Sequence, residues 1–359
     1  MLKRLAYQTL QILIDEPILP DTIKIKNGYG EINVKKKIGM ILALVLCALL
    51  VLAACDNDTP QEQQSLNLIM ATGGVAGTYY PLGGAMAAVI TDRTNLNVTI
   101  TSTGASAANI VQIAQNEAQI AIAQNDVMHY AFTATEIWSD HALGAVTNLA
   151  TLMTLYPETL QIVVEQGSGI YSVEDLRGRR VSIGAPGSGV EANALQVLAA
   201  HGLYRDDISV LQLGFADSAD AMRDGMADAF FVTAATPNTA IMELSTARDL
   251  RILPISGAAA QSLMNDYQFY APITVTAENS GYTWLPESVE TLAVQATLVV
   301  STEMDEQVAY DIVKALIEGR DDIGHDRGRD ISAANAVQAI SVPLHPGALR
   351  FFQEIGYMP

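Results

Sequence analysis

Short apolar runs alternate with segments of helical period along the chain after residue 65. Runs at 66–72, 97–103 and 118–124 are strand candidates, and a stretch with apolar residues three or four positions apart follows each of them. Strands that alternate with helices are typical of βαβ units and parallel sheets. No repeat with a period of 20 to 50 residues is present, so this is not a repeat protein.

The middle of the chain shows the same alternation. A helix is expected from about Glu191 to Ala200, where Gly202 can end it in a left-handed cap. Further strand candidates are 160–166, 180–184, 209–213, 227–233 and 251–256. We therefore expect an α/β protein in which each lobe holds a mostly parallel sheet flanked by helices.

An apolar run at 293–301 is long enough to return from a second lobe to the first. We expect lobe I to comprise 66–160 plus 290–359, and lobe II to comprise 161–289. Two segments then cross between the lobes and can act as a hinge.

The N-terminal part carries an export signal. Fourteen apolar residues at 41–54 follow a cluster of three lysines at 35–37 and precede Cys55. This run is short for a spanning helix, which needs roughly 20 apolar residues. Residues 52–55, LAAC, match the bacterial lipobox, so we expect 34–54 to be a lipoprotein signal peptide and Cys55 to carry a lipid. The alternative is an uncleaved anchor helix.

Residues 1–33 are mixed in charge and do not resemble the start of a signal peptide. We expect them to be a miscalled upstream extension, and a genuine cytosolic extension is the alternative. Residues 55–65 are polar and are expected to form a flexible tether. Asp56 follows the lipidated cysteine, and in Gram-negative lipoprotein sorting an aspartate there is associated with retention at the inner membrane.

Charge excludes one class of partner. The chain has 39 acidic and 20 basic residues and a formal net charge of −19. An acidic surface disfavours nucleic acid and anionic lipid surfaces. A salt-rich habitat and ordinary lineage drift both account for the excess of acids.

Four loops follow strand candidates, where open α/β sheets bind ligands. The first, 72–81, combines glycines with two tyrosines, and the second, 102–106, opens a helix at Ser106. The third, 123–126, follows a strand candidate and carries amide and carboxylate groups. Gln124 has no evident structural role there, whereas Asp126 can also cap the next helix. Plain turns are the alternative for each loop.

The fourth loop, 184–192, fits the dinucleotide pattern G-x-G-x-x-A through Gly187, Gly189 and Ala192. A helix N-terminus also binds a carboxylate, and soluble dinucleotides are scarce outside the cell. The loop therefore favours a small anionic or polar ligand, with a dinucleotide site and a structural turn as alternatives.

Catalytic patterns are absent from the sequence. No G-x-S-x-G elbow is present, and the histidines show no metal-binding spacing: His129, His141, His201, His325 and His345. The sequence therefore indicates a binding protein rather than an enzyme, with no cofactor and no metal.

Several segments together resemble the solute-binding subunit of TRAP transporters of the TAXI type, which are tripartite uptake systems driven by ion gradients. The segments are ATGGVAGTYYPLGGAMA, TSTGASAANI, AQIAIAQNDV, SVEDLRGRRVSIGAPGSGVEANAL, ADAFFVTAATPNTAIMEL and VPLHPGALRFFQEIGY. The resemblance implies a two-lobed periplasmic-binding-protein type II fold that closes on a small carboxylate or an amino acid such as glutamate. It also implies membrane permease subunits as partners. A lipoprotein sensor with the same fold is the alternative.

The resemblance also implies a ligand site. Carried over residue by residue, the site comprises Gly74, Thr78, Tyr79, Ser106, Gln124, Asp126, Ser188, Gly189, Thr233 and Pro237. His345 is expected to pack the C-terminal helix instead.

The chain departs from the family at several positions. Val190 replaces a threonine and Ala105 replaces a glycine. The usual alanine-glycine pair of the lobe II turn reads Ala234-Ala235, and Trp284-Leu285 replaces a glycine-glutamine pair. A lost hydroxyl and a gained indole predict a pocket for a larger or less charged solute.

Overall fold

The computed structural model describes residues 26–27, 30–31 and 65–359. The chain divides into two compact units, 1–63 and 64–359. In the first unit, β1 (Lys26–Asn27) pairs antiparallel with β2 (Gly30–Glu31). The predicted signal peptide, Cys55 and the tether up to residue 64 lie outside the described residues. Within the described ranges, no helix has both the length and the apolar character needed to cross a membrane.

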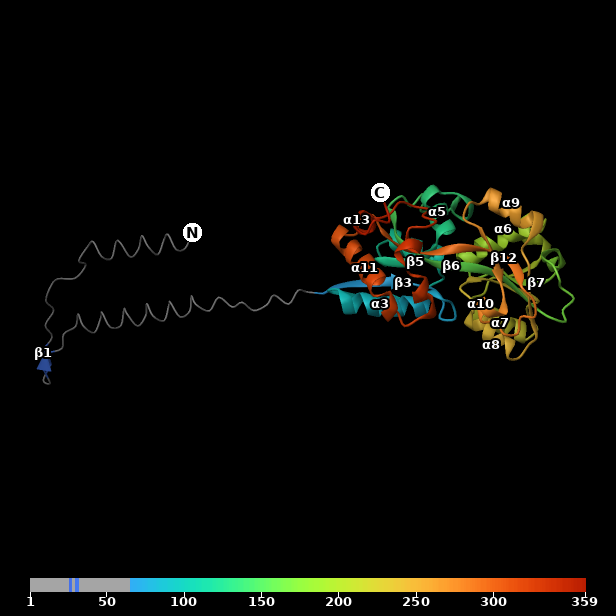
Figure 1. Ribbon diagram of the computed structural model, residues 1–359, viewed down its shortest axis with the longest axis horizontal. Coiled ribbons are helices and arrows are strands. Elements are labelled where there is room, and N and C mark those ends of the chain that lie inside the picture. Colours follow the sequence, from blue (N-terminus) through green and yellow to red (C-terminus); the bar gives the residue numbers. More distant parts are fainter. Residues whose placement is uncertain (1–25, 28–29, 32–64) are drawn as a thin grey trace. The chain divides into compact units, whose positions relative to one another are not determined.

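The second unit is built on one ten-stranded mixed sheet (Figure 1). Two long strands run through its middle, β6 (Leu149–Glu165) and β12 (Val289–Ser301). The other strands are β3 (Leu66–Ala71), β4 (Leu96–Thr101), β5 (Ile120–Gln124), β7 (Arg180–Ser182), β8 (Ser209–Leu211), β9 (Ala229–Ala234), β10 (Leu250–Leu253) and β11 (Ala271–Val275).

The two halves of the sheet share one topology. The first half has the order β4-β3-β5-β12-β6, in which β12 is antiparallel to both neighbours and the other four strands run in one direction. The second half has the order β8-β7-β9-β6-β10, in which β6 is the antiparallel strand. Each half is therefore a mostly parallel sheet with one inserted strand. β6 belongs to both halves, and the first residues of β12 pair antiparallel with β11.

Helices cover both faces of the sheet (Figure 1). In the first half they are α3 (Tyr79–Arg93), α4 (Ser106–Ala114), α5 (Asn125–Thr133), α11 (Glu306–Glu318), α12 (Ala333–Ala336) and α13 (Pro346–Glu354). In the second half they are α6 (Gly189–Ala200), α7 (Phe215–Arg223), α8 (Thr239–Ser245), α9 (Gly257–Asp266) and α10 (Ala277–Ser280). Short 3-10 turns lie at Glu136–Trp138, Val173–Leu176, Arg205–Asp207, Arg320–Asp322 and Asp326–Asp330.

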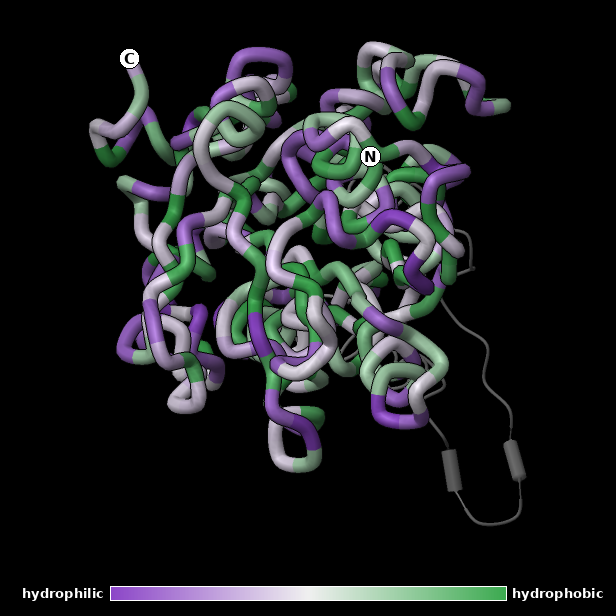
Figure 2. The backbone as a smooth tube through the Cα atoms, turned by 90° about the vertical axis from the view of Figure 1, so that its right-hand side faces the viewer, coloured by the Kyte–Doolittle hydropathy of each residue, from purple (hydrophilic) through white to green (hydrophobic). Residues whose placement is uncertain are grey.

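Strand alternation explains why both faces are covered. Ile122 of β5 packs in the cluster under α3 and α11, whereas Ala121 and Ala123 face α4 and α5. In the second half, Ile162 of β6 faces α6 and α9, and Val163 faces α7 and α8. Successive side chains of a strand point to opposite faces, so a continuous apolar run can be buried on both. In Figure 2, hydrophobic positions follow the interior segments and hydrophilic positions lie mostly on outer helices and turns.

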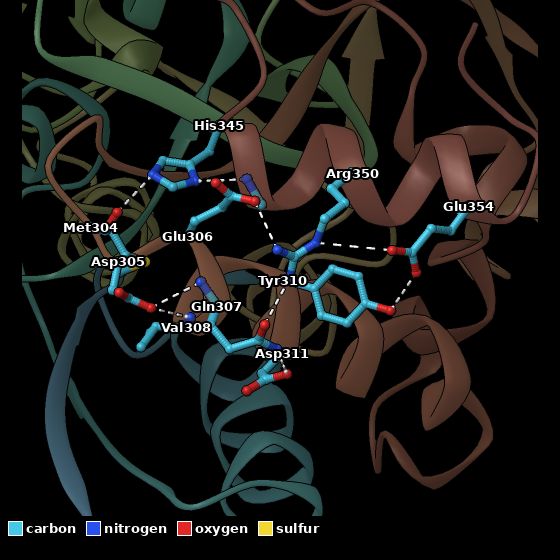
Figure 3. Close-up of polar contacts among 11 residues, drawn as sticks. Met304, Asp305, Glu306, Gln307, Val308, Tyr310, Asp311, His345, Arg350 and Glu354 are labelled. Atoms are coloured by element: carbon cyan, nitrogen blue, oxygen red, sulfur yellow. Dashed lines mark hydrogen bonds and ion pairs between the residues drawn. The ribbon is translucent and has the colours of Figure 1, made fainter.

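The C-terminal helix α13 packs on α11, as predicted (Figure 3). His345 caps α13 by accepting a hydrogen bond from Gly347 N at 3.2 Å, and its Nε2 lies 3.0 Å from Met304 O. A methyl group at Gly347 would overlap the backbone of α11 at Glu306. Arg350 donates to Glu306 at 2.7 Å across the helix pair.

The predicted α/β fold class is confirmed. The structure corrects one strand, because β6 begins at Leu149 and not near residue 160. Residues 149–164 are buried almost without interruption, and an apolar run without alternation gives no signal that separates strand from helix. The lobe limits 66–160 plus 290–359 and 161–289 remain a prediction.

Candidate functional site

A cavity of about 50 Å³ lies at the carboxyl ends of β3, β5 and β9, opposite the first residues of α6. Strand carboxyl ends and helix N-termini meet there, which is where open α/β sheets bind their ligands. The lining residues are Gly73, Gly74, Gly77, Thr78, Tyr79, Ala105, Ser106, Gln124, Glu158, Gly189, Val190, Phe215, Thr233 and Ala234.

The loop between β3 and α3 forms one wall. Gly77 N donates to Gly74 O at 2.9 Å and closes a tight turn. Gly74 has open space where a side chain would be, so its backbone is accessible. Thr78 precedes α3, and Tyr79, the first residue of α3, is buried with its hydroxyl donating to Glu158 Oε2 at 2.8 Å.

Ser106 and Gln124 form the adjoining wall. The Ser106 hydroxyl accepts a hydrogen bond from Gln124 N at 3.1 Å and so joins the start of α4 to the end of β5. Ala105 has φ 73° and ψ −145°, a conformation that essentially only glycine adopts without strain. A glycine at this position would remove that strain. Ala105 therefore stores strain directly at the cavity wall.

Glu158 is the functional candidate that the sequence reasoning missed. It lies in the middle of β6, and its side chain is 2% exposed. Burial is the main cause that raises the pKa of Glu158 to about 8; the hydrogen bond from Tyr79 lowers this pKa and the charge of Asp126 raises it. Glu158 is the one charged residue in 149–164, and this was the available signal, because a carboxylate is rarely buried without a partner.

The second half of the sheet contributes the start of α6. Gly189 packs so closely on Gln124 that a methyl group there would overlap the amide oxygen of Gln124. Ala107 N also donates to Gly187 O at 3.1 Å. These contacts join segments from both halves of the sheet, and residues of both halves line the cavity.

Three of the ten predicted residues do not line this cavity. Ser188 is the N-cap of α6, and its hydroxyl accepts from Glu191 N at 3.2 Å. Pro237 lines a neighbouring cavity of about 340 Å³ together with Arg327. Asp126 is fully buried beside the cavity. The structure brings together the other seven: Gly74, Thr78, Tyr79, Ser106, Gln124, Gly189 and Thr233.

Asp126 joins α5 to α6 instead. Its carboxylate accepts from Asn193 Nδ2 at 2.7 Å, and Asn193 Nδ2 also donates to Tyr270 Oη at 3.1 Å. Gln196 then donates to Tyr130 Oη at 3.0 Å, so the polar contacts continue along α6. Burial raises the pKa of Asp126 to about 6.

The cavity has an unusual charge composition. Among the residues that line the cavity, Glu158 alone has a carboxylate or a basic side chain. Favourable sites for a ligand anion come from the positive end of α6 and from the hydroxyls of Thr78, Ser106 and Thr233. In the described part of the chain, no group of three or more His, Cys, Asp and Glu side chains is arranged to hold a metal ion.

The predicted effect of Trp284 on the pocket is wrong. Trp284 does not line the cavity but packs on Tyr282, with ring centroids 5.3 Å apart. Tyr282 is fully buried among residues of α7 and α8, so the indole extends that cluster. Only the tertiary packing separates this position from the ligand loops.

Solved structures of solute-binding proteins are similar to this chain. The alkanesulfonate-binding protein SsuA from Xanthomonas axonopodis pv. citri, bound to MOPS, is 17% identical with a TM-score of 0.48, over 82% of this chain and 84% of that chain. The aliphatic sulphonate-binding protein SsuA from Escherichia coli is 15% identical with a TM-score of 0.46, over 82% and 84% of the two chains. An ancestral arginine-binding protein bound to arginine is 15% identical with a TM-score of 0.47, over 75% and 97%.

Because these TM-scores are all below 0.5, the family of the chain is assigned from its sequence and not from these structures. The NMT1-like family matches residues 70–356, which include every residue that lines the cavity. The chain belongs to the NMT1-like family, whose members are of the periplasmic solute-binding type.

Proposed function

We propose that this protein captures a small carboxylate or an amino acid between two lobes and delivers it to the membrane permease of a TRAP transporter of the TAXI type. The observation that carries the proposal is the cavity to which both halves of the sheet contribute, lined by Thr78, Ser106, Gln124, Glu158 and Thr233 among smaller residues. The TAXI assignment is supported by the motif segments, five of which supply cavity-lining residues or their neighbours.

The ligand carboxylate binds at the start of α6. Gly189 and Val190 of the first turn of α6 line the cavity, and the first backbone N–H groups of a helix have no partner within the helix. The hydroxyls of Thr78, Ser106 and Thr233 add donors around the same space. No arginine lines this cavity, so backbone groups and hydroxyls replace a guanidinium clamp.

Opening of the lobes releases the ligand. The strands β6 and β12 are the two connections that the proposal assigns to the hinge. Opening separates Gln124 from Gly189 and breaks the hydrogen bond between Ala107 and Gly187. Opening also breaks the hydrogen bonds of Asn193 with Asp126 and of Gln196 with Tyr130. The contacts that a ligand makes with both lobes then favour the closed form.

The lipid on Cys55 holds the receptor at the outer face of the inner membrane. Tethering confines the domain to a thin layer above the permease and raises its effective concentration there. Asp56 supports retention at that membrane in a host with two membranes.

The test is identification of the natural ligand. The purified protein is denatured and the released small molecules are identified by mass spectrometry, after which the affinity of the identified ligand is measured by calorimetry. We expect a small carboxylate or amino acid, and an affinity at least about 10-fold weaker in Gln124→Ala, whose amide contributes to the cavity wall. The exposed Gln261→Ala is the matched control. A released nucleotide, or equal affinity in Gln124→Ala, would refute the proposed site.

A further inference from the structure

Two oxygen acceptors share one wall of the cavity. Glu158 and Gln124 both line it, and each is 2% exposed. Gln124 Oε1 has no hydrogen-bond partner among the residues that the structure describes. A buried acceptor without a partner is costly, so this wall requires a donor that the described protein does not supply.

Among the described residues, no Lys, Arg or His side chain lines the cavity beside Glu158, and the charge of Arg327 acts on the neighbouring Tyr156. The titratable groups that act on it are Tyr79 of α3, Asp126 of α5 and Tyr156 of β6, and Gln124 of β5 adds a hydrogen bond. Tyr79 donates to the carboxyl group at 2.8 Å, and Asp126 contributes a negative charge. Arg327 lines the neighbouring cavity instead, where it pairs with Asp330 at 3.1 Å. A charged Glu158 therefore has no opposite charge within its own wall.

We propose that Glu158 and Gln124 form a subsite for a protonated primary amine of the solute. The inference depends on the proposed function and narrows it, because it selects amino acids over carboxylates that lack an amine. An ammonium group supplies three N–H donors and one positive charge. It provides Gln124 Oε1 with its missing donor and Glu158 with its missing counter-charge, while the carboxylate of the same solute faces the start of α6.

Binding of the amine is coupled to release of a proton. Burial raises the pKa of Glu158 to about 8, so the free protein carries the protonated carboxyl group at pH 6.5. An ammonium group beside it stabilises the carboxylate, and the proton leaves to solvent as the ion pair forms. A solute that places a carboxylate on this wall keeps Glu158 protonated and releases no proton. The two classes of solute therefore differ in the number of protons exchanged.

The experiment compares amino acids with the 2-oxo acids of the same carbon skeleton. The pairs are L-glutamate with 2-oxoglutarate, L-alanine with pyruvate, and L-leucine with 4-methyl-2-oxopentanoate. Calorimetry at pH 6.5 in phosphate and in Bis-Tris gives the affinity and the number of protons exchanged. We expect at least one amino acid to bind about 30-fold or more tighter than its oxo acid and to release close to one proton.

Glu158→Gln tests the residue itself. Glutamine retains an acceptor for Tyr79 but has no charge, so we expect about 30-fold weaker binding of the amino acid and no proton release. Glu165→Gln, at the end of the same strand, is the control and should match the wild type. The proton count of the wild type needs no variant and remains decisive where Glu158→Gln is unstable.

Three results would overturn the inference. Equal affinity for an amino acid and its oxo acid, or binding of the amino acid without proton release, would refute the amine subsite alone. Unchanged affinity in Glu158→Gln would do the same. Failure of every compound of the six to bind the folded wild type would refute the proposed ligand class, and the amine subsite with it.

Discussion

Replacement of Glu158 by glutamine should remove a large part of the pH dependence of stability. Glu158 is 2% exposed in the middle of β6, and burial raises its pKa from 4.5 to about 8. Between these two values the folded protein holds a proton that the unfolded chain releases. The free energy of unfolding therefore falls as the pH rises through this window, and the loss is complete above the folded pKa.

The magnitude follows from the two pKa values. One unit of pKa difference corresponds to about 1.4 kcal/mol, so Glu158 should remove about 4 kcal/mol of stability between pH 5 and pH 9. Glutamine does not titrate and can still accept the hydrogen bond from Tyr79. Burial raises the pKa of Asp126 to about 6. Because Asp126 is present in both proteins, its contribution largely cancels when the free energies of unfolding of Glu158→Gln and the wild type are subtracted.

Urea unfolding followed by circular dichroism at pH 5, 6, 7, 8 and 9 measures this difference. The stability of Glu158→Gln relative to the wild type should rise by about 4 kcal/mol across the series, most steeply between pH 5 and pH 8. Glu165→Gln is the control, since its side chain is 37% exposed and pairs with Arg248 on the surface. A constant difference between Glu158→Gln and the wild type at all five values would refute the raised pKa.

Two further changes test the geometry of the cavity wall. Ala105→Gly should stabilise the protein by about 1 kcal/mol in urea unfolding, because Ala105 has φ 73° in a region that favours glycine; a loss of stability would contradict the strain. Gly189→Ala should weaken binding of the identified ligand about 10-fold or more in calorimetry, because the new methyl group displaces the buried amide of Gln124 from its place. Unchanged affinity would show that the close contact between Gly189 and Gln124 does not form in the liganded protein.

Much of the candidate site was predictable because it lies in loops with distinctive residues. Glycine-rich turns after strands and a helix start such as Ser106 have local signals, and seven of the ten predicted residues line the cavity. Asp126 and Ser188 are also polar residues in such loops, but each accepts a hydrogen bond from a residue of α6 instead of lining the cavity. Their direction depends on where α6 packs, which no local pattern encodes.

Glu158 was missed for a related reason. Its neighbours in sequence are apolar or small, so it forms no motif, and only the pairing of β6 with β12 and β9 sets it beside Tyr79 and Gln124. Trp284 is the reverse case. The sequence predicted that it lines the pocket, whereas its indole packs on Tyr282.

The sequence by itself determined the α/β fold class, the alternation of strands and helices, and most of the loops that line the cavity. These depend on periodicity and on glycine and capping residues, which act over a few positions. The tertiary structure alone decided that β6 and β12 run through the middle of one ten-stranded sheet, that Glu158 lines the cavity, and that Asp126 does not. These features depend on which distant segments pack together, and burial then sets the charge state of the carboxyl groups they enclose.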